Sequence, residues 1–139
     1  MRSTDFSDVF KVATAGMRAQ GDRLRIIAEN IANANSTGLS PGAEPYRRRQ
    51  ITFKEVLDTS SGLSTVKVAS ITGDMTPFGR EFNPSHPAAD ADGYVLKPNV
   101  KSLVESIDMK EAQRSYEANL SVIDTVKNML ARALDILRG

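Results

Sequence analysis

The chain has 139 residues, with 18 basic and 17 acidic side chains and a formal net charge of +1. This length favours one domain, or two small ones, and excludes a large multidomain enzyme. The near balance of charge argues against nucleic acid or an anionic membrane as a partner. The absence of cysteine excludes disulfides, thiol nucleophiles and thiolate metal sites.

The sequence shows neither a secretory leader nor a membrane span. Residues 1–8 lack the apolar run of a secretory signal, and no stretch of about 20 apolar residues follows. We therefore expect a soluble chain without direct membrane insertion, which leaves the cytoplasm, if it does, without a cleaved signal peptide.

Helix-breaking residues divide the chain into three segments. All six prolines and six of the nine glycines lie between residues 38 and 98. We expect residues 1–38 and 99–139 to supply the two helices of an inner coiled-coil domain. Residues 39–98 are expected to form a small β-rich or irregular insert.

The first segment has the spacing of a coiled-coil helix, with apolar residues three and four positions apart and one polar member. The seam consists, apart from alanines, of Phe6, Phe10, Met17, Gln20, Leu24, Ile27 and Ile31. The pattern predicts a helix over about 5–35. Thr4 or Asp5 is the predicted N-cap, and Gly38 the predicted left-handed residue at its end.

The last segment repeats this pattern from near Asn99 or Ser102. Its seam consists, apart from alanines, of Met109, Tyr116, Asn119, Ile123, Val126, Leu130 and Leu137. We therefore expect a mainly α fold in which the long N- and C-terminal helices pair as an antiparallel coiled coil. Gln20 and Asn119 would then lie at one level and set the register, or each would face solvent from a slightly rotated helix.

The closing stretch is too apolar for a two-helix pair to cover. From residue 118 to 137, 12 of 20 residues are apolar. A helix that is apolar nearly all round is buried on more than one side. We therefore predict a subunit whose ends become ordered on assembly, with contacts to other subunits through Leu120, Met129, Leu134 and Ile136.

The middle segment predicts three short strands. Apolar residues alternate with polar ones around residues 51–53 and 66–68. A third apolar run, residues 94–96, follows an Asp92-Gly93 turn signal.

Several strings resemble a known family. Residues 27–38, Ile-Ala-Glu-Asn-Ile-Ala-Asn-Ala-Asn-Ser-Thr-Gly, resemble the signature that ends the first helix of the flagellar axial family of rod and hook proteins. Other strings are similar to the proximal-rod class of the bacterial flagellar basal body, and lie at residues 45–48, 83–87, 90–95, 98–100 and 108–119. Residues 39–44 depart from the general axial signature, but such an insertion is similar to what the proximal-rod class shows.

The resemblance implies a structural protein of the periplasmic rod. Such a protein leaves the cell through the flagellar export apparatus and polymerises helically with copies of itself and other flagellar rod proteins. The rod is part of the drive shaft and the export channel. The resemblance implies no enzyme activity, cofactor, nucleic acid or small-molecule substrate.

Four polar residues are candidates for contacts between subunits. Asn30, Asn33 and Asn35 are first of all helix-end and turn residues, and the resemblance implies a second role in tying subunits together. Arg48 lies in the only basic run, Arg47-Arg48-Arg49. It is predicted to be a solvated charge or to pair with acidic groups of an adjacent subunit.

Two other functions are weighed against this one. A soluble coiled-coil adaptor could dimerise through the same seams, and a small hydrolase could use the lone His86 near Asp90 and Asp92. The string Asp90-x-Asp92-Gly93 imitates part of a calcium loop, but Asn99 stands where the bidentate Glu would be. A turn entering a strand explains both aspartates, so we predict no catalytic, cofactor-binding or metal site.

Overall fold

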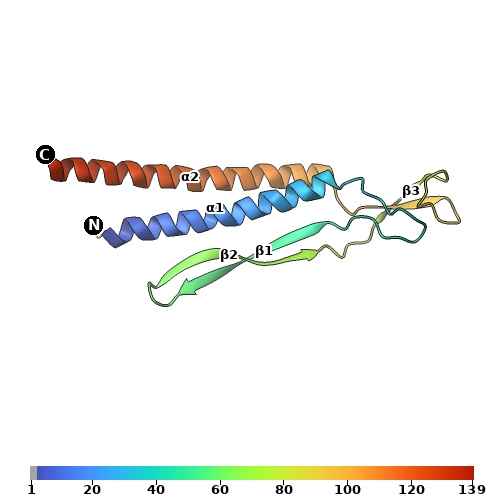
Figure 1. The fold of residues 1–139 in the computed structure, drawn as a ribbon, viewed down its shortest axis with the longest axis horizontal. Helices are drawn as coiled ribbons and strands as arrows, with labels where there is room; N and C mark the ends of the chain where they lie inside the picture. The colour runs from blue at the N-terminus through green and yellow to red at the C-terminus, as the bar shows by residue number, and fades with distance from the viewer. Residues whose placement is uncertain (1–2) are drawn as a thin grey trace. The chain divides into compact units, whose positions relative to one another are not determined.

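The computed structural model describes residues 3–139, with side chains from Phe6 onward. Along the sequence, one helix precedes the β insert and one follows it (Figure 1). The elements in chain order are α1 (Ser3–Ala32), β1 (Arg49–Asp58), β2 (Leu63–Gly73), β3 (Gly79–Phe82), β4 (Tyr94–Lys97) and α2 (Ser102–Arg138). The prediction of long terminal helices around a small β-rich insert is confirmed. Neither helix, over the described part of the chain, combines the length and apolar character needed to cross a bilayer.

Helix α1 ends differently from the prediction. Thr4 and Asp5 lie inside the helix, and the side chains of this predicted cap fall outside the described residues. The helix stops at Ala32, three residues early, where the Asn33 side chain donates to the carbonyl of Glu29 over 2.9 Å. Gly38 does not have the predicted positive φ, which occurs among the described residues at Gly42, Gly62 and Gly93.

Gly38 is instead required by a close approach of two backbone segments. A Cβ at this position would lie 2.5 Å from the carbonyl oxygen of Ala43. The backbone N–H of Tyr46 donates to the carbonyl of Ser36 over 2.8 Å and holds the loop closed. The glycine therefore gives room for a tight loop, rather than a left-handed helix end.

The chain forms two compact units, each built from segments far apart in sequence. The first unit contains α1 up to Leu24, Thr52–Ser70 and Lys110–Gly139, and the second contains Arg25–Ile51 and Ile71–Met109. These units are defined by contacts, whereas the predicted boundaries after residues 38 and 98 follow the sequence. The division into three sequential segments stays a prediction.

In the first unit, α1 packs against α2 through small and apolar side chains. Its buried residues include Ala13 and Ala19 of α1 and Ile123 and Val126 of α2. Gly16 lies beneath Asn119, because a Cβ on Gly16 would be 2.8 Å from the Asn119 amide nitrogen. Arg23 pairs with Glu111 at 3.7 Å. The contacts of Gly16 and Arg23 thus follow opposite orders along the two helices.

Strands β1 and β2 are hydrogen-bonded neighbours. The four residues between them end in Gly62, whose φ of 71° suits a glycine. In the first unit the hydroxyls of Thr52 and Ser70 lie 2.7 Å apart across the pair. The strands predicted at residues 51–53 and 66–68 are confirmed and extend further.

The second unit contains an antiparallel pair, β3 and β4, in which Phe82 lies opposite Tyr94. Strand β4 and the turn before it are confirmed: Asp90 accepts hydrogen bonds from the backbone N–H groups of Asp92 and Tyr94, and Gly93 has a φ of 85°. The prediction of three strands is wrong, because β3 adds a fourth. The four residues of β3, Gly-Arg-Glu-Phe, do not alternate between apolar and polar, so no strand was predicted there. All four are exposed in the structure.

Candidate assembly surface

A buried polar cluster joins the end of α1 to the insert and to α2 within the second unit. Asn30 is 1% exposed. Its amide oxygen accepts from the Tyr46 hydroxyl and the Arg49 backbone N–H, both at 2.9 Å. Its amide nitrogen donates to the Arg49 carbonyl at 2.8 Å and to Glu105 at 3.3 Å. All four bonding positions of the amide are filled, so Asn30 fixes its three neighbours in place.

The charge centre of this cluster is the pair formed by Arg48 and Glu105. Glu105 is fully buried, and its carboxylate accepts from Nε of Arg48. The guanidinium also lies 3.3 Å from Asp74 and 3.8 Å from Asp108. A buried carboxylate is costly unless it is paired and hydrogen-bonded, and here it is both.

Two pKa values reflect this environment. Burial lowers the pKa of Arg48, but the hydrogen bond and charge of Glu105, followed by those of Asp74, raise it above its ordinary value. Burial, followed by the charge of Glu29, raises the pKa of Tyr46. The arginine thus stays charged and the phenol stays protonated, as their hydrogen bonds require.

The four polar candidates from the sequence do not form one surface. Asn30 and Arg48 meet in the buried cluster, where the acidic neighbours of Arg48 belong to its own chain. Asn33 ends α1, and Asn35 is exposed. Contacts of these four residues with other subunits stay predictions.

His86 has the surroundings of a structural histidine. Its Nδ1 accepts from the backbone N–H of Ala88 over 3.0 Å. The proton then resides on Nε2, which lies 3.2 Å from the Thr37 hydroxyl and can donate to it. Within residues 3–139, no three His, Asp or Glu side chains gather as they would around a metal ion.

An apolar groove lies beside the α1–α2 contact of the first unit. It has a volume of about 300 Å³. Its lining consists of Phe6 and Val9 from α1, and Ser121, Val122, Thr125, Val126 and Met129 from α2. None of these side chains is charged, and the two polar ones are hydroxyls, so the groove suits apolar side chains.

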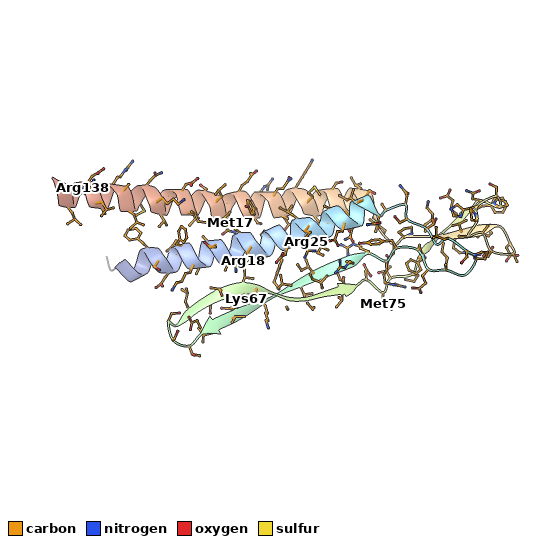
Figure 2. All side chains as sticks on the ribbon, viewed as in Figure 1. Met17, Arg18, Arg25, Lys67, Met75 and Arg138 are labelled. Atoms are coloured by element: carbon orange, nitrogen blue, oxygen red, sulfur yellow. The ribbon has the colours of Figure 1, made fainter. Side chains whose placement is uncertain are left out.

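The end of α2 presents apolar side chains that the other described residues leave exposed. Val126 is 5% exposed, but every residue from 127 to 138 is exposed. We call residues 127–138 the α2 tail, which ends at Arg138 in Figure 2. Leu134 is 58% exposed, and Ile136 and Leu137 are 80% and 83% exposed. Four residues predicted to contact other subunits, including Leu120 and Met129, are therefore accessible.

The remaining seam residues divide into covered and exposed ones. Among the described residues, the following are buried or half-buried: Phe6, Met17, Gln20, Leu24, Ile27, Ile31, Met109, Tyr116, Asn119, Ile123 and Val126. Phe10 and Leu130 are about 40% exposed, and Leu137 more so. The buried amide oxygen of Gln20 has no hydrogen-bond partner among the described residues, and its role in register stays a prediction.

Sequence reasoning missed Glu105 and Asn99. Asn99 accepts from the backbone N–H of Arg48 over 2.7 Å and donates to the carbonyl of Asp74 over 2.9 Å. For Glu105, the only local signal was its place in the first turn of a predicted helix. An acidic residue there indicates no more than an ordinary interaction with the helix dipole. Arg48, the partner that both residues share, lies more than 50 residues away in sequence.

Comparison with known proteins gives the class of the chain. The family model described as flagella basal body rod protein matches residues 10–38, and that of the C-terminal part of flagellar basal body rod FlgEFG proteins matches residues 91–136. Both descriptions define a flagellar basal-body rod protein.

Individual relatives narrow this class. The flagellar basal-body rod protein FlgC of Agrobacterium fabrum is 49% identical over 129 residues, 93% of each chain. FlgC of Salmonella typhimurium is 39% identical, and the match covers 93% of this chain and 96% of the relative. FlgC of Borreliella burgdorferi is 40% identical, and the match covers 96% of this chain and 98% of the relative. The chain belongs to the FlgC family and is a structural rod subunit, not an enzyme.

Proposed function

We propose that the chain polymerises helically with copies of itself and with other flagellar rod proteins, and so forms part of the drive shaft and export channel. The α2 tail carries this proposal, because it holds large apolar side chains that the chain leaves exposed. Burying such side chains between subunits supplies the main driving force for association.

The magnitude of this force fits an assembly of many contacts. Burial of a large apolar side chain yields about 1.5–3 kcal/mol, so the four residues Leu130, Leu134, Ile136 and Leu137 give at most about 6–12 kcal/mol. Association costs about 4–15 kcal/mol in lost freedom of motion. One contact alone is therefore weak, and several contacts to one incoming subunit are needed for a stable rod.

We infer that α1 and α2 pair as an antiparallel coiled coil that serves as the inner domain of the subunit. The opposite order of the Gly16–Asn119 and Arg23–Glu111 contacts supports this pairing. The spacing of Ala112, Ile123 and Val126, all buried, supports a helix face of seam type. In this arrangement the seam holds the subunit together, and the α2 tail joins it to others.

The place and route of assembly are also part of this proposal. The relatives are named basal-body rod proteins, and we infer the periplasmic rod as the location of this chain. Delivery by the flagellar export apparatus follows from the family resemblance and suits a chain without cysteine. Asn33 and Asn35 are proposed to contact neighbouring subunits at the base of the helices. Asn30 and Arg48, whose bonding partners named above lie in the same chain, are proposed to support those contacts only by holding the end of α1 in place.

Limited proteolysis and sedimentation of the purified chain test the proposal. We expect cleavage near the two ends at low concentration, protection of the middle, and oligomers or rods at high concentration or after mixing with other rod proteins. A closed dimer at every concentration would contradict the proposal and indicate a coiled-coil adaptor. Electron microscopy of the concentrated sample distinguishes rods from closed particles.

A further inference from the structure

We propose that the α2 tail of one copy binds in the apolar groove of a second copy, between the start of its α1 and residues 121–129 of its α2. This inference rests on the proposed function and names the partner of its assembly surface. Each contact is then directional, because one copy contributes its tail and the other copy contributes its groove.

The face of the tail continues an interface that is already formed. Ile123 and Val126 are buried in the first unit, and Leu130, Leu134 and Leu137 follow at the same spacing of three and four. Residues at this spacing lie on one face of a helix. The tail therefore presents the face that α1 covers further back, so an α1 surface is the occupant that fits it.

The chain offers such a surface in the groove. Phe6 and Val9 of α1 line it opposite Val122 and Met129 of α2. Arg132 and Asp135 lie on the other side of the tail helix from Leu130, Leu134 and Leu137. An inserted tail can thus place its leucines in the groove and keep these charges in water.

A single copy cannot make this contact with itself. The groove is lined by α2 as far as Met129, and the tail is the direct continuation of the same helix up to Arg138. A continuous helix cannot fold back onto its own preceding turns. Tail and groove share only Met129, and the leucines of the tail lie outside the groove. The contact therefore joins two different surfaces, is head-to-tail and leads to an open helical assembly, unless the rotation closes a ring.

Cross-linking between two single-cysteine variants tests this contact, since the chain has no cysteine of its own. Full-length Val9→Cys, carrying a mass tag, is mixed in turn with untagged Leu130→Cys, Leu134→Cys or Leu137→Cys and oxidised at a concentration where oligomers sediment. The matched control replaces the tail variant with Leu57→Cys, an exposed leucine of β1. We expect at least one tail variant to give tenfold more mixed cross-link than the control.

The outcomes separate the inference from the proposed function. Oligomers with no tail-to-Val9 cross-link above the control would overturn the inference and leave the rod function standing. A dominant cross-link between two tails would also overturn it, because that contact is symmetric. Monomers at every concentration, alone and with other rod proteins, would contradict both. Because no charged side chain lines the groove, the mixed cross-link should change less than twofold between low and high salt.

Discussion

At the residue scale, the fold of the second unit depends on one buried charge pair. Glu105 lies on α2, and Arg48 lies just before β1, 57 residues earlier. Asn30 of α1 bonds to Glu105 as well. Three segments of the chain therefore meet at a single carboxylate, and its removal affects all of them.

The Glu105→Gln variant tests the contribution of this carboxylate. It removes the charge at nearly unchanged size, and we expect the free energy of unfolding to fall by about 1.5–3 kcal/mol, the usual range for hydrogen bonds to charged groups. Urea unfolding followed by circular dichroism measures the change. The matched control, Glu111→Gln, affects a side chain that is 66% exposed and pairs with Arg23, and should cost less than about 1 kcal/mol. Equal losses in the two variants would refute the assigned role.

The turn between β1 and β2 supplies a prediction on pH. Hydrogen bonds from the Ser60 hydroxyl and backbone N–H, and from the Ser61 hydroxyl, lower the pKa of Asp58 to about 2. Because the folded pKa is depressed, the stabilisation is present above the ordinary value of 3.8 and is lost as the pH falls through about 2. NMR titration of the Asp58 carboxyl should show this low pKa, and Ser60→Ala should raise it. An ordinary pKa in the wild-type chain would contradict the hydrogen bonding of the turn.

At the scale of the elements, the sequence predicted the features that depend on residues close to one another in the chain. The spacing of apolar residues predicted both helices, and the Asp92-Gly93 signal predicted the turn before β4. Strand β3 was missed because its exposed residues carry no alternation. The buried pair of Arg48 and Glu105 and the role of Gly38 depend on contacts between distant or looped segments, which periodicity does not encode.

A double-mutant cycle tests the packing of Asn119 on Gly16. An alanine at position 16 gains about 1 kcal/mol in helix propensity over glycine, but its Cβ would meet the Asn119 amide at 2.8 Å. We expect Gly16→Ala to stabilise the Asn119→Ala chain by about 0.5–1 kcal/mol and to give a smaller gain, or a loss, in the wild-type chain. Thermal unfolding of the four proteins measures the coupling. Equal effects of Gly16→Ala in both backgrounds would show that the two residues do not touch.

Two glycine substitutions test the loop after α1. A Cβ at Gly38 would lie 2.5 Å from a backbone oxygen, whereas a Cβ at Gly21, inside α1, would meet nothing within 4 Å. We expect Gly38→Ala to destabilise the chain by about 1–3 kcal/mol through overpacking. Gly21→Ala should stabilise it by about 0.5–1 kcal/mol. Denaturant midpoints give both values, and a stabilising Gly38→Ala would disprove the close approach.

At the scale of the whole molecule, the residues that hold the units together differ from those that the chain leaves exposed at its α2 tail. Contacts such as Gly16 with Asn119 and Arg48 with Glu105 hold each unit together internally. The α2 tail contributes no buried residue to its own unit, and its leucines are exposed. The proposed function assigns the exposed tail to contacts between rod subunits, and the chain belongs to the FlgC family of rod proteins.

Sedimentation velocity of a tail variant over a range of concentrations tests the central claim most directly. Leu134→Asp places a charge on the tail face, and Leu57→Asp, whose leucine is equally exposed at 58%, is the matched control. We expect the wild-type chain and the control to form oligomers at the same concentrations. The Leu134→Asp chain should need at least tenfold more protein while keeping its helical circular dichroism. Unchanged association of Leu134→Asp would contradict the claim that the α2 tail joins subunits.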